Sequence, residues 1–424
     1  MSPPTPVSWS GWGCGFSFMA MGELFDEITD YYNFVDADAE VAHGKRDHQS
    51  YIDMEREREM VYNSRIRVIR NHTYRHGKLR EKVIFEPKRR ELLIPRLSDR
   101  LIHHAVTRVI KPYLEAYFHK DSFSCRKGSE HIKVYLSDKG DAGPYLTYFR
   151  NKNHRNTYPR AFTIPQAVNY VREDAEQQFP GQVHKVVFEA GRGQLAACRD
   201  YQAKIRSAIG RWGWNFWILA IDFKSFYASI NHDVLMFLYG RLIKDPDVLW
   251  LLEQILEACP EGLPIGFLPS QDGGNIIGST VDYMATDILG IKLYDRYADD
   301  IRILCRTREQ AEQNLAALDR FVNTRLKMRF SDNKTKIYKW AGKDTFCGYV
   351  VCPHHFEPKP ATVKRAHRRM KKKLEEFKAG KITAQQLHDT AESHLSYRAY
   401  TSKPYDALAE SCIRTAAEAE HQIH

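Results

Sequence analysis

Acidic side chains at the ends of predicted strands are the first sign of chemistry in this sequence. Residues 217–222 form a continuous apolar run that ends in Asp222, a pattern typical of a buried strand. Asp299 and Asp300 lie between two alternating apolar stretches, so a hairpin would present both at its tip. Carboxylates that converge from separate elements are the ligands that hard ions such as Mg²⁺ prefer. Two such ions, about 3.5–4 Å apart, are what nucleotidyl transfer requires.

The adjacent aspartates have a second interpretation. Asp is a favoured turn residue, so Asp299-Asp300 could equally mark a solvent-exposed turn that performs no chemistry. The pair alone does not decide between these interpretations, and the choice depends on the elements and motifs around it.

Helical and strand patterns are both recognisable along the chain, and its length is sufficient for two or three subdomains. The stretch 134–210 is the hardest to assign, because Gly, Asn, Arg and Tyr are frequent there. Thr383 and Gln386 have the spacing of a helix capping box. The expected elements are helices within 22–70, a hairpin over 78–95, helices over 100–118, 164–178, 195–209 and 232–243, two strands that meet at a tight turn over 291–305, and a basic helix from 361.

Composition and charge are those of a folded protein with a polyanionic partner. The chain has 424 residues, 43% of them apolar, and a formal net charge of +10. This charge favours nucleic acid, although many basic proteins bind none. The eight cysteines show no C-x₂-C spacing, so we expect reduced thiols. No stretch reaches the roughly 20 apolar residues of a membrane span, and no signal peptide is recognisable. We therefore expect a cytoplasmic protein without membrane contact.

Motifs around the three aspartates resemble those of bacterial reverse transcriptases. Residues 222–230 (Asp-Phe-Lys-Ser-Phe-Tyr-Ala-Ser-Ile) resemble the catalytic palm motif, and Tyr297-Ala298-Asp299-Asp300 resembles the Y-x-D-D box. The other matches follow in family order: 87–100 and Ser124–Gly128 with the fingers motifs, Gly262–Gly266 and Ser270-Gln271 with the loop that contacts template and nucleotide, Asn333–Thr335 with the late-palm lysine motif, and Phe346–Tyr349 with the primer grip.

This resemblance implies an α+β right-hand polymerase fold with fingers, an antiparallel ferredoxin-like palm and a helical thumb. The expected domains are an N-terminal helical extension (1–75), fingers (76–133), an insertion or link that could bind RNA (134–210), the palm (211–352) and the basic thumb (353–424). The insertion mixes cations and aromatic rings as an RNA-gripping loop would, although a disordered surface insertion is the alternative. The residues concerned are Tyr148, Arg150, Lys152, His154, Arg155 and Tyr158.

The resemblance also assigns a metal site. Asp222 and Asp299 would be the principal ligands of two Mg²⁺ ions, with Asp300 in support and Phe223 in the same site; Mn²⁺ could substitute.

Nucleotide-binding roles follow in the same way. Tyr227 would lie under the incoming sugar and favour deoxynucleotides, unless it is a core tyrosine. Arg126 would neutralise the triphosphate, because guanidinium forks suit phosphate oxygens. Lys334 would steady or protonate the leaving pyrophosphate, unless it is a surface lysine. Further candidates for nucleotide contact are Lys88, Arg89, Arg90, Ile265 and Gln271.

Two more regions would hold the nucleic acid. Cys347, Gly348 and Tyr349 would form the primer grip, where Gly348 lets the backbone approach the primer end unless it is an ordinary strand-edge glycine. The basic thumb helix would bind phosphates without reading sequence, with a merely solvated face as the alternative. Its candidate residues are Lys364, Arg365, Arg368, Arg369 and Lys372.

The type of reverse transcriptase is narrowed by the loop around Ile265. Retrons and group II intron enzymes carry glutamine there, whereas this loop resembles diversity-generating retroelements and the bacterial "unknown group" enzymes, many of them defence-associated. Phe267, where the mutagenic enzymes usually have asparagine, and the long 134–210 stretch favour a defence enzyme that copies a dedicated structured non-coding RNA. A mutagenic retroelement enzyme is the alternative.

The expected partners are therefore that RNA, its cDNA and dNTPs, while the oligomeric state is left open. Two other function classes are an inactive RNA-binding scaffold and an RNA-dependent RNA polymerase or template-free nucleotidyltransferase. The complete set of carboxylates disfavours the scaffold, and Tyr227 disfavours ribonucleotides.

Overall fold

The chain folds into two compact units, each built from two separate stretches of sequence. The computed structural model describes residues 23–42, 49–85, 89–126, 131–137, 146–149, 156, 164–189, 191–395 and 407–421. The first unit comprises residues 1–117 and 225–277, and the second comprises 118–224 and 278–424. These units do not follow the five domain ranges expected from the resemblance, which stay predictions.

The first unit is mainly helical and carries the hairpin predicted over 78–95. Asp245 caps α9 by accepting hydrogen bonds from the amides of Asp247 and Val248, and it also accepts one from the amide of Phe25 in α1. One side chain thus joins two distant stretches of this unit. Its elements are α1 (Glu23–Ile28), α2 (Tyr31–Ala42), α3 (Gln49–Arg56), α4 (Arg58–Arg70), β1 (Arg80–Ile84), β2 (Arg90–Ile94), α5 (Leu97–Tyr117), η2 (Tyr227–Ser229), α8 (His232–Leu242), α9 (Pro246–Leu256) and part of α10 (Leu268–Tyr283).

The second unit is built around a four-stranded antiparallel sheet with the strand order β7-β8-β6-β9. With the helices between them, these strands run βαββαβ in sequence, which is the ferredoxin-like topology expected for the palm. The strands of this unit are β3 (His131–Leu136), β4 (Leu146–Phe149), β5 (Val183–Glu189), β6 (Trp217–Asp222), β7 (Tyr294–Tyr297), β8 (Asp300–Cys305), β9 (Lys336–Lys339), β10 (Asp344–Phe346), β11 (Tyr349–Val351) and β12 (Phe356–Pro358). Its helices are α6 (Ile164–Gln178), α7 (Gln194–Trp212), the end of α10, η3 (Met284–Ile288), α11 (Arg308–Phe321), η4 (Val322–Leu326), α12 (Pro360–Lys378), α13 (Ala384–Leu395) and α14 (Ala407–His421).

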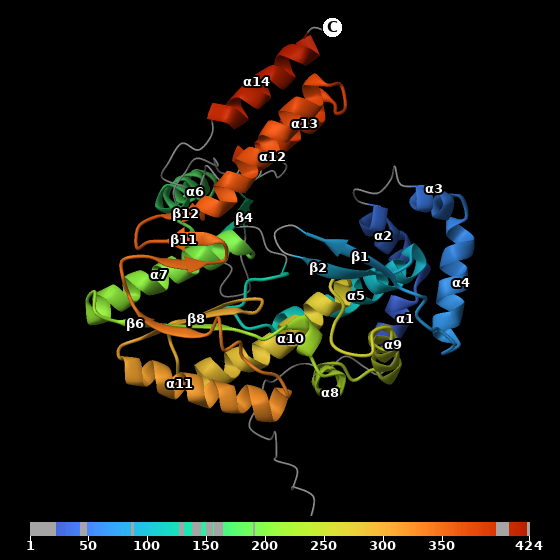
Figure 1. The fold of residues 1–424 in the computed structure, drawn as a ribbon, viewed down its shortest axis with the longest axis horizontal. Coiled ribbons are helices and arrows are strands. Elements are labelled where there is room, and N and C mark those ends of the chain that lie inside the picture. Colours follow the sequence, from blue (N-terminus) through green and yellow to red (C-terminus); the bar gives the residue numbers. More distant parts are fainter. Residues whose placement is uncertain are drawn as a thin grey trace, which may run out of the picture. The chain divides into compact units, whose positions relative to one another are not determined.

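Strand β6 is buried on both faces, as its uninterrupted apolar run predicts. Because successive side chains alternate, Ile218 faces the α7 and β10–β12 side, where it shares a core with Tyr201 and Phe346. Leu219 and Ile221 are also fully buried, and α11 packs against β6, β8 and β9. Figure 1 shows α7 and α11 on opposite sides of these strands. The two layers fix the end of β6, where Asp222 lies.

The stretch 134–210 contains more regular structure than its sequence pattern revealed. The helices expected over 164–178 and 195–209 are present as α6 and α7, but a three-stranded sheet of order β4-β3-β5 was missed. Ile132, Val134 and Leu136 pack against α6 through Ala167 and Val171. Within the described residues, this part is therefore a folded substructure.

The C-terminal region is helical, as expected. Met370 of α12 packs with residues of α13 and α14 in a small apolar core. The predicted capping box is present: the amide of Thr383 donates to Gln386 (3.1 Å) and the amide of Gln386 donates to the Thr383 hydroxyl (3.2 Å). In the parts of the chain that the structure describes, we find no helix whose length and apolar character would suit a membrane crossing.

Candidate functional site

The strand register brings the predicted carboxylates together. Strands β6 and β8 pair antiparallel, with Asp222 directly opposite Asp300. Directly opposed residues of an antiparallel pair have Cβ atoms about 4.5–5.5 Å apart on the same face. Asp299 lies in the tight turn between β7 and β8. The three residues expected to hold metal ions therefore lie at the same end of the two central strands, β6 and β8, and in the turn that precedes β8.

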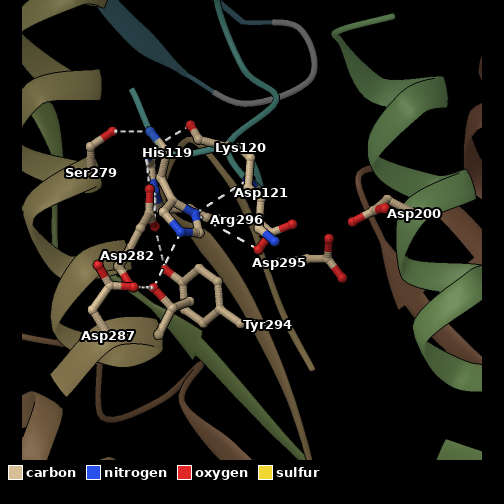
Figure 2. A network of polar contacts seen from close by, with 12 residues as sticks. His119, Lys120, Asp121, Asp200, Ser279, Asp282, Asp287, Tyr294, Asp295 and Arg296 are labelled. Atoms are coloured by element: carbon tan, nitrogen blue, oxygen red, sulfur yellow. Dashed lines mark hydrogen bonds and ion pairs between the residues drawn. The ribbon is translucent and has the colours of Figure 1, made fainter. Parts of the chain in front are cut away.

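The turn that carries Asp299 adopts an unusual backbone conformation and is supported from below. Ala298 has φ = 53°, in the left-handed region that residues other than glycine rarely occupy. Arg296 donates to the carbonyl oxygen of Ala298 (3.1 Å). Its guanidinium also holds both carboxylate oxygens of Asp282 (2.7 and 2.8 Å) and the hydroxyl of Ser122 (2.7 Å). Figure 2 shows this buried network around Arg296.

The Arg296–Asp282 ion pair is buried, so the loss of either partner would leave an unpaired charge inside the protein. Both side chains are completely inaccessible to solvent. Gly278 lies against the guanidinium, and a Cβ atom added there would overlap it. An unpaired buried charge is strongly destabilising, so this assembly fixes the turn only while all its members are in place. Sequence analysis did not identify Arg296 or Asp282, because neither belongs to a periodic pattern.

The carboxylates repel one another. The pKa of Asp300 is raised to about 6, mainly by burial and further by the charges of Asp299 and Asp222, while the nearby Arg302 opposes this rise. A cation between them would relieve this repulsion. Lys334 donates a hydrogen bond to Asp222 (2.6 Å), and this bond raises the pKa of Lys334.

The donor set fits hard divalent ions. Carboxylate oxygens are their preferred ligands, and the site already attracts the Lys334 ammonium. Phe223, predicted in the same site, is buried, and its ring meets that of Phe330 edge to face. This contact anchors the chain directly after Asp222.

A second acidic cluster was not predicted. Asp121, Asp200 and Asp295 place carboxylate oxygens within 4.8 Å of one another, and Figure 2 shows Asp200 reaching from α7 toward Asp295. The ammonium of Lys204 lies among all three, at 3.0, 2.7 and 2.9 Å respectively. It stands where a metal ion would have to bind, so we interpret the cluster as a neutralised structural network. Only the i, i+4 spacing of Asp200 and Lys204 could have hinted at it.

In the first unit, Tyr227 and the loop around Ile265 form one assembly. The amide of Leu263 donates to the Tyr227 carbonyl oxygen (2.7 Å). Gly262 has φ = 64°, and a Cβ atom there would lie 2.5 Å from the Cα of Ala228. Only glycine permits this close approach. Ile265 is 40% exposed, whereas Gln271 of α10 is half-buried.

Two of the cations that were predicted to bind phosphate, Arg126 and Arg89, have partners within the protein. The guanidinium of Arg126 donates to the carbonyl oxygens of His119 (2.7 Å) and Ser122 (2.9 Å), and it lies over the ring of Phe118. Arg89 pairs with Glu91 at 2.8 Å. Lys88 lies outside the described residues, as do Arg150, Lys152, His154, Arg155 and Tyr158. Tyr148 is buried and donates to Asp174 (2.6 Å), so its role is structural and the proposed RNA contact was wrong for this residue.

The predicted primer grip is a two-residue hairpin turn between β10 and β11. Cys347 and Gly348 have φ = 50° and 85°, which is the pattern of the type I′ turn that suits twisted strands. A Cβ at Gly348 would meet nothing within 4 Å, so φ is what demands glycine there. Tyr349 is buried against Phe356.

Helix α12 presents the predicted basic surface. Lys364, Arg365, Arg368, Arg369 and Lys372 are all exposed. Glu376 pairs with Lys373 (2.7 Å), and Lys372 lies 3.9 Å from it.

One family model of known proteins matches the part of the chain that contains the three carboxylates. The family model described as reverse transcriptase (RNA-dependent DNA polymerase) matches residues 188–351. This range contains the three carboxylates, Tyr227, Ile265, Lys334 and the hairpin turn, but neither Arg126 nor α12. No curated protein sequence matches the chain.

Similar solved structures are distant. They include apo telomerase from Candida tropicalis truncated from its C-terminal domain (11% identity, 67% of this chain and 55% of that chain covered, TM-score 0.41). Telomerase from Candida albicans in complex with a TWJ fragment of telomeric RNA is 10% identical. The match covers 83% of this chain and 65% of that chain, with a TM-score of 0.42. A chain of a partial Cas6-RT-Cas1–Cas2 complex is 21% identical. The match covers 71% of this chain and 42% of that chain, with a TM-score of 0.31. The chain thus spans 55% of the length of the first of these structures. The reverse transcriptase model matches residues 188–351, which is less than half of the chain.

Proposed function

We propose that this chain synthesises DNA on an RNA template by two-metal nucleotidyl transfer. The observation that carries the proposal is the β6–β8 register, which sets Asp222 opposite Asp300 next to the turn that holds Asp299. The domain match over 188–351 supports the same activity.

The carboxylates would hold the metal ions, with Asp222 and Asp299 as principal ligands and Asp300 in support. When bound, the ions would supply activation of the primer 3′-hydroxyl and charge neutralisation on the triphosphate. Lys334 is positively charged at neutral pH, and its hydrogen bond to Asp222 raises its pKa further. We assign it to neutralising the leaving pyrophosphate.

Tyr227 is proposed to select deoxynucleotides. A Cβ added at Gly274 would lie 2.8 Å from its ring, so the ring rests against the backbone of α10. A sugar bound against a ring held in this way would meet the ring where a 2′-hydroxyl projects.

Primer extension tests the activity. A DNA primer on an RNA template should be extended with dNTPs and Mg²⁺ by the wild-type chain and at least about 10³-fold more slowly by Asp299→Ala, since a metal ligand is lost. Asp319→Ala removes a carboxylate from α11 and should extend normally. Extension by Asp299→Ala at the wild-type rate would refute the metal assignment. Preference for ribonucleotides, or extension without a template, would favour the other polymerase classes, and no extension would favour an inactive scaffold.

The biological role that we propose is antiphage defence in a bacterium, with a dedicated structured non-coding RNA as template. Support comes from the described elements β3, β4, α6 and β5, which give the chain a surface beyond the matched domain. Phe267 is buried between His76 and His103, so its difference from asparagine has a packing reason in this chain. A mutagenic retroelement enzyme stays the alternative, since Ile265 cannot hydrogen-bond near the templating base.

Sequencing the nucleic acid that co-purifies with the protein separates these roles. A single abundant structured RNA with its cDNA is the expected result. A template-repeat transcript whose cDNA carries errors at adenines would instead establish diversification.

A further inference from the structure

Arg302 makes contacts with two parts of the second unit that have different proposed tasks. It lies two residues after Asp300 on β8, and its side chain therefore emerges on the same face of the sheet. Its guanidinium donates to the carboxylate of Asp300. It also donates to Asp344 (3.1 Å) and to the carbonyl oxygen of Thr345 (2.7 Å), both in β10. Its cationic centre lies 5.5 Å from the ring centroid of Phe346.

The β10 side of this contact is itself rigidly held. Asp344 is 6% exposed and accepts hydrogen bonds from the hydroxyls of Tyr201 (2.7 Å) and Tyr338 (2.6 Å). Strand β10 continues directly into the Cys347-Gly348 turn, and Phe346 pairs with Tyr349 across it. A displacement of Asp344 would therefore be transmitted to the turn within three residues.

We propose that Arg302 is a positioning residue that fixes the primer-side hairpin turn relative to the metal-side carboxylates. The proposal rests on the proposed function, because it takes Asp300 as a member of the metal site and 347–349 as the primer grip. A planar fork can serve two acceptors in fixed directions at once, which a lysine ammonium cannot do with the same geometry. Its side chain is only 11% exposed, so water does not readily replace either contact.

A bridge of this kind predicts a specific kinetic defect. If the primer terminus is held by the hairpin and the reaction centre by the carboxylates, loss of the bridge misplaces the 3′-hydroxyl. Misplacement on the order of 1 Å can cost about 100-fold in rate. Among the described residues, Arg302 donates to Asp300, Ile301, Asp344 and Thr345, none of which is a predicted nucleotide-binding residue. We therefore expect the defect in primer use and turnover, with the KM for dNTP near its wild-type value.

Steady-state primer extension with Arg302→Lys and Asp344→Asn tests the bridge. Asp344→Asn removes the charge on the hairpin side and leaves Asp300 and its Arg302 contact intact. We expect the KM for primer–template to rise roughly tenfold in both variants and kcat to fall further in Arg302→Lys. Arg308→Lys makes the same exchange on exposed α11 and should behave as wild type. Thermal denaturation shows whether each variant is folded at the assay temperature.

Two results would overturn the bridge. One is an unchanged primer–template KM in folded Asp344→Asn, and the other is an equal rise of the KM values for primer–template and dNTP in Arg302→Lys. Equilibrium binding of a fluorescent primer–template in the absence of dNTPs makes the test independent of turnover. If the wild-type chain extends no primer, the proposed function fails; the bridge still requires weaker binding by Asp344→Asn and is refuted if that binding is unchanged.

Discussion

At the scale of single residues, the turn that carries Asp299 depends on buried side chains with several hydrogen-bond partners. Arg296 is the clearest case, because a fully buried guanidinium meets Asp282, Ser122 and the carbonyl of Ala298. The neighbour that makes this possible is Gly278, whose missing side chain leaves space for the guanidinium.

Gly278→Ala should therefore destabilise the protein by about 1–3 kcal/mol, because the added methyl forces the Arg296 network apart. Primer extension should fall with it, since the turn at Asp299 loses its support. Gly210→Ala is the matched control: it is also helical, and a Cβ there meets nothing within 4 Å. That exchange should be neutral or stabilise by roughly 0.5–1 kcal/mol. Urea denaturation compares the two, and equal midpoints would contradict the packing argument.

Tyr227 should control the choice of sugar. Tyr227→Val opens the space next to the sugar, so the ratio of kcat/KM for ribonucleotides to that for deoxynucleotides should rise by about tenfold or more. Tyr227→Phe keeps the ring and should retain the wild-type ratio. If Tyr227 is only a core tyrosine, both variants will change stability and leave this ratio unaltered.

At the scale of elements, α12 combines two faces with different tasks. Met370 packs with α13 and α14, while the five predicted cations are exposed. An exposed cationic row on a helix anchored in this way is suited to phosphate contact.

Replacing those cations by glutamine should weaken binding of an RNA–DNA hybrid. Each phosphate contact that is lost should reduce the slope of log K against log salt by about 0.7–0.9. A control with the same change in net charge replaces Arg308, Arg320, Lys327, Lys336 and Lys339, which are also exposed. Fluorescence anisotropy at several salt concentrations measures both. Equal slopes in the two variants would show that only total charge matters and that α12 is not a specific contact.

At the scale of the second unit as a whole, Lys204 joins three separate segments. Asp121 precedes β3, Asp200 belongs to α7 and Asp295 belongs to β7, and all three contact its ammonium. Burial alone would lower the pKa of Lys204, but the three carboxylates raise it above its ordinary value. Burial raises the pKa of Asp295 well above its usual range despite Lys204.

Lys204→Met should therefore destabilise this unit by about 3–5 kcal/mol at neutral pH, because it leaves buried carboxylates without a counter-charge. The pKa of Asp295 is already raised in the folded state and should rise further in the variant. A raised folded-state pKa means that the folded state binds more protons, so stability falls as pH increases above the unfolded value of about 3.9. The defect should thus be smaller at pH 5 than at pH 8. Lys339→Met, an exposed exchange, should show no such trend in urea denaturation, and a defect independent of pH would exclude the electrostatic cause.

The sequence by itself determined the elements whose residues form an uninterrupted local pattern. The apolar run 217–222, the hairpin at 78–95, the helices α5, α6 and α7, and the capping box at Thr383 are all present in the structure. The three aspartates lie, as expected, at the ends of such strands or in the turn between them, while their role as metal ligands stays a prediction. Periodicity within one segment reports which face of that segment is buried, and this needs no knowledge of its partner.

Only the tertiary structure decided which distant residues meet. Tertiary structure decides the register that opposes Asp222 and Asp300 and the contacts of Arg296, Arg302 and Lys204. These contacts include pairs of residues that are 14 to 83 positions apart. The sheet β4-β3-β5 was missed for the same reason, because its central strand pairs with a strand beyond α6. These charged side chains are buried because some of their partners arrive by long-range pairing, so local spacing marks them only in part.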